Sequence, residues 1–396
     1  MLAPALSAWL AGCWLAIITA TTYIGDDLIN KDIRAAAAER GTDLGGLIGH
    51  YTSQWMTEQG RFFPGSLGWS YTVFWVTEVR VPYKFVLGAV LVACVAACAL
   101  LSVTLTGRWR VAPALVASAV CFVQVRVGFD AIIGFAGLVP LTLGLCAAAI
   151  VLLVRGRGWV SALVAAALYS MALVTYETVI LFVPAMAALV VYWRRRWLPA
   201  LALVVPAALA AGAAVVLRGA VRTPTLAAYT VDLDPHVVVP TFAKQALAAL
   251  PMSQWILGAP GVPSVPTGAV VVAALVCGLP VAALMLSASG GPLRASWAAI
   301  VSLGGFGLWI WLTSALLTGI TVRWQEEVHR GQGYLSVVYG YLGCALLACA
   351  IWLVGERLVA DRSRTARAAW RITSALVIAA VATATMAGNL AITSLV

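Results

Sequence analysis

Hydrophobic residues come in long runs along the whole chain, and short polar or charged stretches separate one run from the next. Each run is about 20 residues long, which a helix needs to cross the ~30 Å hydrocarbon core of a bilayer. Backbone groups in lipid must be satisfied within the protein, and the alternating pattern of a membrane β-barrel does not occur. The sequence therefore predicts an all-α polytopic membrane protein with about eleven transmembrane helices, at residues 4–23, 84–106, 111–127, 135–154, 159–175, 177–193, 198–217, 268–287, 297–318, 335–354 and 372–393.

Basic residues predict the orientation of these helices. If the N-terminus is cytoplasmic, the short inner loops hold 13 arginines against two acids, Glu356 and Asp361. This is the distribution that the positive-inside rule describes, and an odd number of spans places the C-terminus outside. Three outer segments are long, at residues 24–83, 218–267 and 319–334, so most of the mass outside the membrane is expected on the outer face.

Composition adds little to this interpretation. The chain of 396 residues is 62% hydrophobic and 10% charged, with a net charge of +10. Because the basic residues lie in loops between apolar runs, the charge indicates topology and does not predict a nucleic-acid partner. The eight cysteines fall inside apolar runs and are expected to be buried. The three histidines, His50, His236 and His329, lack the spacing of a zinc site.

The first outer segment begins with two adjacent acids, Asp26 and Asp27. Residues 26–40 predict a helix, because the aspartates favour its N-terminus, an alanine run follows and Gly41 ends it. Residues 43–59 predict a second helix with one apolar stripe, suited to lie along a membrane surface. An irregular, aromatic-rich loop containing Arg61 is expected at residues 60–71.

This layout resembles the GT-C superfamily of membrane glycosyltransferases. The resemblance rests on Asp26-Asp27 directly after the first span, on the helical first outer segment and on the large later outer segment. The stretches GRFF (60–63), TYE (175–177) and GQGY (331–334) are similar to those of bacterial surface-polysaccharide glucosyltransferases. The resemblance covers most of the chain. It implies a polyprenyl-phosphate sugar donor, a glycan or glycolipid acceptor, and an active site that faces outside the bacterial plasma membrane.

Transfer of a sugar from a lipid phosphate needs a base for the acceptor hydroxyl and positive charge for the leaving phosphate. Asp26 or Asp27 is the candidate base, and adjacent helix positions point ~100° apart, so one of the two is expected to face the substrate. A divalent cation, Mg²⁺ or Mn²⁺, is a possible cofactor. The candidate substrate-binding residues are Glu177, Arg61, Arg323, His329, Arg330, Tyr334 and Arg218, with Arg222 and Trp324 nearby.

Three further expectations concern residues outside this set. Lys84 is interpreted as an anchor at the membrane interface, and Arg126 and Asp130 as a local ion pair. Within the proline-rich segment 224–267, a short amphipathic helix is expected to serve either as a lid or as a connector.

Two other functions fit the pattern of spans. One is a polymerase or ligase that acts on lipid-linked saccharides, although its large outer loop would be expected later in the chain. The other is a transporter or flippase, which predicts repeated halves and charged or broken helices near the middle of the membrane. The composition, rich in alanine, valine and arginine and poor in lysine, favours a GC-rich bacterial source.

Overall fold

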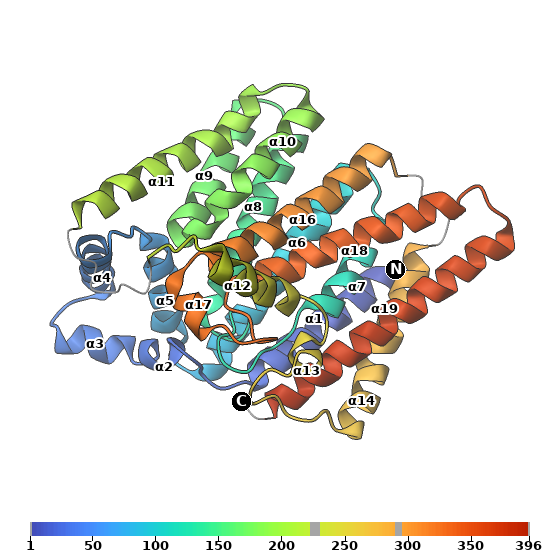
Figure 1. Ribbon diagram of the computed structural model, residues 1–396, viewed down its shortest axis with the longest axis horizontal. Coiled ribbons are helices and arrows are strands. Elements are labelled where there is room, and N and C mark those ends of the chain that lie inside the picture. Colours follow the sequence, from blue (N-terminus) through green and yellow to red (C-terminus); the bar gives the residue numbers. More distant parts are fainter. Residues whose placement is uncertain (1, 222–229, 290–294, 395–396) are drawn as a thin grey trace.

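The computed structural model describes residues 2–221, 230–289 and 295–394, and these form an all-α protein (Figure 1). Apart from one isolated antiparallel bridge between Val231 and Thr321, the described residues contain no β structure. Each of the eleven predicted spans overlaps an apolar helix, as a multi-pass membrane protein requires. These helices are α1 (Leu2–Ala20), α6 (Arg80–Thr106), α7 (Val111–Phe122), α8 (Leu138–Arg155), α9 (Trp159–Thr175), α10 (Val183–Arg194), α11 (Leu201–Ala220), α14–α15 (Thr267–Ala273 and Leu279–Ala288), α16 (Trp297–Gly319), α18 (Val337–Val359) and α19 (Arg364–Thr393).

Nine helical segments in the described ranges are long and apolar enough to cross a membrane, if α10 is counted with the 3₁₀ helix before it (Glu177–Phe182) and α14–α15 as one segment. The other two are shorter: α7 has 12 residues and α9 has 17. At 1.5 Å per residue, α7 is about 18 Å long, well short of the ~30 Å hydrocarbon core.

The predicted span at 111–127 is therefore too long, because α7 ends at Phe122 and an irregular, mostly buried segment follows. Polar side chains of other elements replace the missing helix hydrogen bonds. The Asn389 side chain accepts from the Val125 amide and donates to the Val123 carbonyl, and Thr385 donates to the Cys121 carbonyl. Non-helical backbone is tolerated within a membrane protein when it is buried and satisfied in this way.

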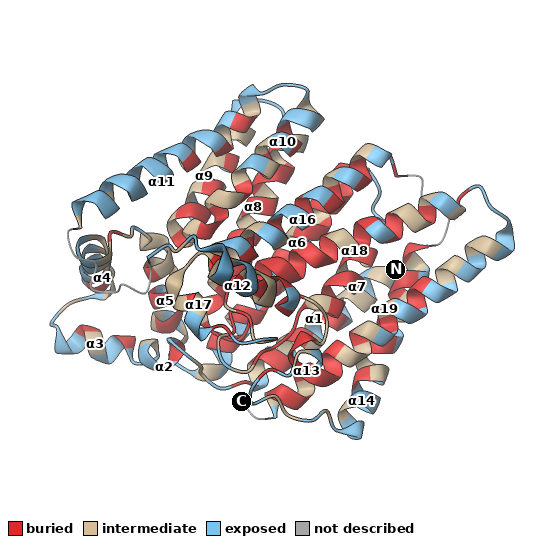
Figure 2. Ribbon diagram, in the orientation of Figure 1, coloured by how far each residue is buried: buried red, intermediate tan, exposed pale blue. Residues whose placement is uncertain are grey.

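The core lies around α18, which packs against α16 and α7. Glycines allow this close contact: a Cβ at Gly307 would lie 2.5 Å from the Gly343 carbonyl oxygen, and one at Gly343 would lie 2.6 Å from that of Gly307. Small residues at helix interfaces are a common means of close packing in membranes. Figure 2 shows α18 largely buried and α11 largely exposed. The exposed apolar surface of α11 is suited to contact lipid.

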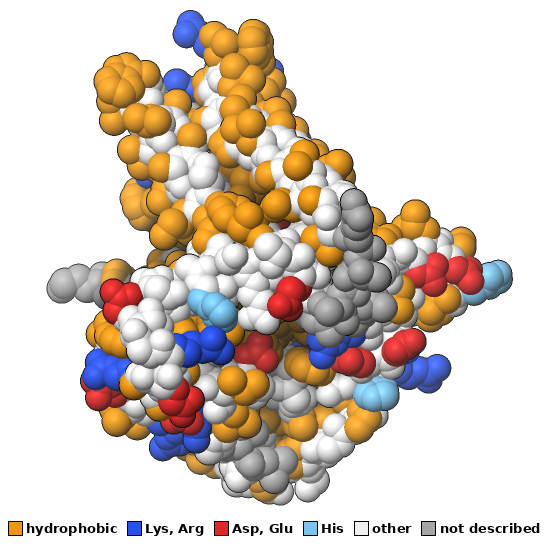
Figure 3. Space-filling model, turned by 90° about the vertical axis from the view of Figure 1, so that its left-hand side faces the viewer, with side chains coloured by type: hydrophobic (Ala, Val, Ile, Leu, Met, Phe, Trp, Pro, Cys, Tyr) orange, Lys and Arg blue, Asp and Glu red, His pale blue; other side chains and the backbone are white. Residues whose placement is uncertain are grey.

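The three predicted outer segments fold into short helices that gather at one end of the long ones (Figure 1). The first segment forms α2 (Asp27–Asn30), α3 (Ile33–Glu39), α4 (Leu44–Gln59) and α5 (Pro64–Thr77), the second α12 (Pro235–Ala248) and α13 (Ser253–Ile256), and the third α17 (Val322–Glu327). Figure 3 shows acidic, basic and histidine side chains over this end of the molecule, below helices with a mainly hydrophobic surface.

Two expectations for the first segment are wrong. The helix expected at 26–40 is broken at Lys31–Asp32 into α2 and α3. The loop expected at 60–71 is helical from Pro64, because a proline at the first helical position and a buried face against α9 start helix α5. The helix expected at 43–59 is confirmed as α4, and the Asp43 side chain caps it by accepting from the Gly46 amide.

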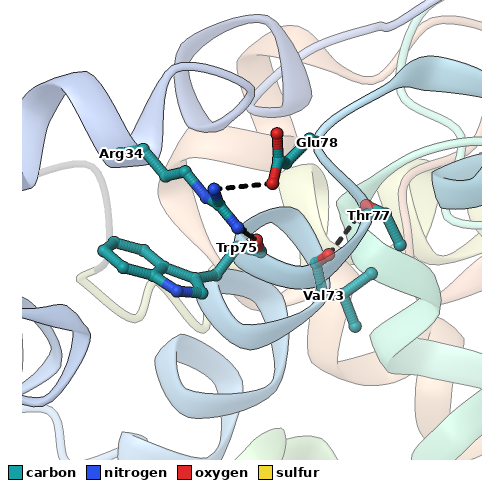
Figure 4. Close-up of polar contacts among 5 residues, drawn as sticks. All are labelled: Arg34, Val73, Trp75, Thr77 and Glu78. Atoms are coloured by element: carbon teal, nitrogen blue, oxygen red, sulfur yellow. Dashed lines mark hydrogen bonds and ion pairs between the residues drawn. The ribbon is translucent and has the colours of Figure 1, made fainter.

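Arg34 of α3 holds the surface helices together (Figure 4). Its guanidinium donates to the Trp75 carbonyl near the end of α5, with an Nη2–O distance of 2.6 Å, and pairs with the Glu78 carboxylate at 2.6 Å. It also lies 5.2 Å from the centre of the Trp75 ring. These contacts fix α3 against α5, beside the cavity described next.

Candidate functional site

A cavity with two adjoining lobes opens among α2, α4, α5 and α17. The basic lobe has a volume of about 280 Å³ and contains the side chains of Arg61, Arg218 and Glu177. The polar lobe has a volume of about 190 Å³ and is lined by Asp27, Asn30, Ser70 and Tyr71, among others. Both lobes share the residues at their junction, which are Asp26, Trp55, Phe63, Ser66, Phe135 and Leu138.

Asp26 lies where the two lobes meet. The chain turns there between α1 and α2 through Gly25, whose φ of +54° is the left-handed conformation that glycine adopts without strain. Partial burial raises the pKa of the Asp26 carboxyl above its ordinary value, and the positive charge of Arg323 opposes this shift. Asp26 is therefore a carboxyl group with increased basicity that faces both lobes.

Asp27 occupies a different environment, although it is the next residue. Its side chain is 1% exposed, and its Oδ1 atom accepts from the Phe135 amide at 2.9 Å. Burial raises the pKa of Asp27 to about 6, while Lys84 and the Tyr83 hydroxyl oppose the shift. The expectation that Lys84 anchors the chain at the membrane interface is wrong: this lysine is fully buried and donates to the Ile133 carbonyl. Asp27 thus helps to join α2, α6 and residues 133–136.

The raised pKa of Asp27 predicts a pH-dependent stability. Between the unfolded pKa of about 4 and the folded value of about 6, the folded state binds more protons than the unfolded state, so stability falls as pH rises through this interval. A pKa shift of about two units corresponds to about 3 kcal/mol, by which the ionised Asp27 lowers the free energy of unfolding above pH 6. We expect the free energy of unfolding, followed from pH 4 to pH 7, to decline more steeply in the wild type than in Asp27→Asn. Parallel curves would contradict this assignment.

An ion pair between Arg61 and Glu177 crosses the basic lobe. Arg61 Nε lies 2.7 Å from Glu177 Oε1, and the guanidinium lies 4.8 Å from the centre of the Phe63 ring. Close backbone contact brings Arg218 to the same place, because a Cβ at Gly60 would lie 2.9 Å from the Arg218 Cα atom. The structure thus brings together three charged residues that lie far apart in the sequence.

Aromatic rings form another wall of the basic lobe. Trp324 of α17 and Tyr334 are stacked, with ring centres 3.5 Å apart, and Phe129 meets both rings edge-on. Arg323 lies over the outer side of Trp324 and pairs with Glu327 at 3.0 Å. Trp324 is 5% exposed and lies between Arg323 and Tyr334, so the less buried Tyr334 is the ring that a ligand can contact, while Arg323 acts on the cavity through its charge.

Not every predicted residue lies at this cavity. His329 and Arg330 are exposed and are not among the residues that line either lobe. Arg222 lies outside the described residues. Conversely, Ser66, Ser70 and Tyr71 were missed as site residues, although they belong to the aromatic-rich stretch 60–71. The sequence predicts a loop for that stretch, so it does not indicate which side chains share the face of a helix.

Arg126 is a fully buried residue that organises the neighbouring segments. Its guanidinium donates to the carbonyls of Gly331, Gln332 and Ala248 and to the Tyr341 hydroxyl. The prediction that Arg126 and Asp130 form an ion pair through their side chains is wrong. The Asp130 carboxylate instead accepts hydrogen bonds from the backbone amides of residues 126, 132 and 133.

The position of Arg126 explains why the GQGY stretch, residues 331–334, contains two glycines. Gly331 and Gly333 have φ values of +72° and +66°, and a Cβ at Gly331 would lie 2.8 Å from the Ser253 carbonyl oxygen. The chain can therefore turn tightly around the guanidinium. The turn delivers Tyr334 to the basic lobe, where the Gln245 side chain accepts from its amide at 2.7 Å.

Within the described residues, no group of three or more histidine, cysteine or acidic side chains lies close enough to hold a metal ion. Comparisons of the chain with known protein families, with curated proteins and with solved structures found no match.

Proposed function

We propose that this protein is a membrane glycosyltransferase of the bacterial plasma membrane. It moves a sugar from a polyprenyl-phosphate donor to a glycan or glycolipid acceptor on the extracytoplasmic face. The observation that supports this proposal best is the composition of one cavity: a carboxyl group of raised pKa, two arginines and stacked aromatic rings meet at the end of the apolar helices.

In the proposed reaction the acceptor hydroxyl oxygen attacks the anomeric carbon of the donor sugar. A new carbon–oxygen bond forms as the bond from that carbon to the phosphate oxygen breaks, and the electron pair leaves with the polyprenyl phosphate. Asp26 accepts the hydroxyl proton, and attack opposite the leaving group inverts the anomeric centre. Asp26 suits this role because it faces both lobes and its raised pKa makes it a stronger base.

Positive charge in the basic lobe would stabilise the departing phosphate. Arg61 and Arg218 line this lobe, and Glu177 holds the Arg61 guanidinium in place. Guanidinium groups suit phosphate because they offer several N–H donors in a fixed plane. The ring of Tyr334, supported from behind by Trp324, would pack against the apolar face of the donor sugar.

We expect Arg61→Gln to raise the donor KM by about 10- to 100-fold, because a charge-assisted hydrogen bond to phosphate contributes roughly 1.5–3 kcal/mol. Initial rates measured against donor concentration test this expectation. Lys31→Gln is a suitable control, since Lys31 is an exposed basic residue of the same segment that lines neither lobe. An unchanged donor KM in Arg61→Gln would place the phosphate elsewhere.

The protein in lipid nanodiscs can be incubated with polyprenyl-phosphate hexoses and pentoses that carry radiolabelled sugars, together with bacterial envelope fractions as acceptor. Label that moves into the acceptor fraction, and does so with inversion, supports the proposal. Absence of transfer and of sugar release with every donor would overturn it.

A transporter or flippase is the second candidate, and the interrupted helix after Phe122 favours it, because broken helices are common at transport sites. Proteoliposomes loaded with a fluorescent polyprenyl-phosphate sugar distinguish the two functions. A flippase would move the lipid between leaflets equally well with Asp26→Asn, whereas sugar transfer requires the carboxylate.

A further inference from the structure

The polar lobe has a chemical character of its own. It is lined by side chains that carry neutral hydroxyl or amide groups, namely Ser66, Ser70, Tyr71 and Asn30, and by the two adjacent aspartates. Among the described residues that line it, none is a lysine or arginine. The basic lobe, by contrast, contains Arg61 and Arg218. The basic lobe is therefore suited to an anionic group, whereas the polar lobe is not.

We infer that the polar lobe is the acceptor subsite, and that the group it binds is a single uncharged sugar ring. This inference deepens the proposed function and rests on it, because a sugar bound in this lobe is an acceptor only if the protein transfers sugars. The volume of the polar lobe, about 190 Å³, is below the roughly 300–1,000 Å³ of sites for drug-sized ligands and suits one sugar ring.

The lining of the lobe matches the chemistry of a sugar. Hydroxyl groups both donate and accept hydrogen bonds, and the lobe offers hydroxyls, an amide and carboxylate acceptors. Phe74 and Phe135 supply apolar surface for the C–H groups of the ring. Burial keeps the pKa of the Tyr71 hydroxyl above its ordinary value, so this group remains a donor.

Charge excludes other acceptors. A uronic acid or a sugar phosphate in this lobe would place its negative charge beside Asp26 and Asp27, with no lining cation among the described residues to offset the repulsion. Like charges held close together in a partly buried site strongly disfavour binding. We therefore expect the polar lobe to bind neutral methyl glycosides at least about tenfold more tightly than methyl glucuronides.

The location of the lobe supports its role as acceptor subsite. Asp26 lies at the junction of the two lobes, so a hydroxyl of a sugar in the polar lobe can reach the Asp26 carboxylate while the donor lies in the basic lobe. Phe63 and Trp55 also border both lobes, so each lobe has aromatic surface beside the acid.

Ser70→Leu tests this assignment, because Ser70 of α5 is buried and lines the polar lobe but not the basic lobe. The added volume should weaken binding of methyl hexosides at least tenfold, as measured by saturation-transfer NMR on protein in nanodiscs. Release of sugar from a radiolabelled polyprenyl-phosphate hexose to water, measured on the wild-type protein, reports separately on the donor lobe. Thr72→Leu, an exposed position on the same helix, is the matched control.

The outcomes separate the two proposals. Equal hexoside binding by wild type and Ser70→Leu, or binding of glucuronides as tight as that of neutral glycosides, overturns the acceptor subsite. If wild-type protein binds hexosides in the lobe but never releases donor sugar, the subsite stands as a sugar site and the glycosyltransferase proposal fails. Should Ser70→Leu not fold, Asn30→Leu fills the same lobe from α2 and gives the same test.

Discussion

Asp26→Asn is expected to lower kcat for sugar transfer by about 10²- to 10⁴-fold, because the acceptor hydroxyl loses the group that takes its proton. Asparagine keeps the size of the side chain and its exposure to both lobes, so the KM for the donor should change little. Thermal unfolding should also stay close to that of the wild type, since Asp26 makes no side-chain cap to α2. Initial rates with a polyprenyl-phosphate hexose donor measure the effect.

Two acids in the same segment serve as comparisons for Asp26. Asp32→Asn should retain transfer, because Asp32 is exposed and lines neither lobe. Asp27→Asn should affect stability and its pH dependence more than the proton transfer, because Asp27 is buried and accepts from the Phe135 amide. Full transfer by both Asp26→Asn and Asp27→Asn would refute a carboxylate base at this site.

Arg126→Met is expected to destabilise the protein by about 3–5 kcal/mol, because several buried acceptors lose their donor at once. The substitution leaves the carbonyls of Gly331, Gln332 and Ala248 buried without their donor. Each unsatisfied buried acceptor costs about 1–3 kcal/mol. Thermal or denaturant unfolding in detergent, followed by tryptophan fluorescence, measures the change.

The matched control for Arg126 is Arg330→Met. Arg330 is exposed and close in sequence to the same turn, so its loss should change stability by no more than about 0.5 kcal/mol. Arg126→Lys should give an intermediate loss, because an ammonium group keeps the charge but does not reach several carbonyls at once. A loss below about 1 kcal/mol in Arg126→Met would show that the guanidinium does not hold these segments together.

The length of the hydrophobic runs alone determined much of the fold. Each of the eleven apolar runs lies on an apolar helix because the bilayer leaves the backbone few other ways to satisfy its hydrogen bonds. The N-cap of α4 could also be predicted, since Asp43 acts on amides within the same turn. Local interactions of this kind are contained in the sequence itself.

Tertiary structure decided what neighbouring residues in the sequence cannot show. Asp26 and Asp27 are identical in type and adjacent, yet Asp26 lines both lobes, whereas Asp27 lines the polar lobe alone and is buried against the Phe135 amide. Lys84 and Arg126 were interpreted from their immediate neighbours, whereas their partners are 49 to 215 residues away. The end of α7 likewise depends on Asn389, which supplies from α19 the hydrogen bonds that the helix gives up. Such contacts form only when distant segments meet, so the pattern along the chain indicated the candidate residues, and packing decided which of them share a site.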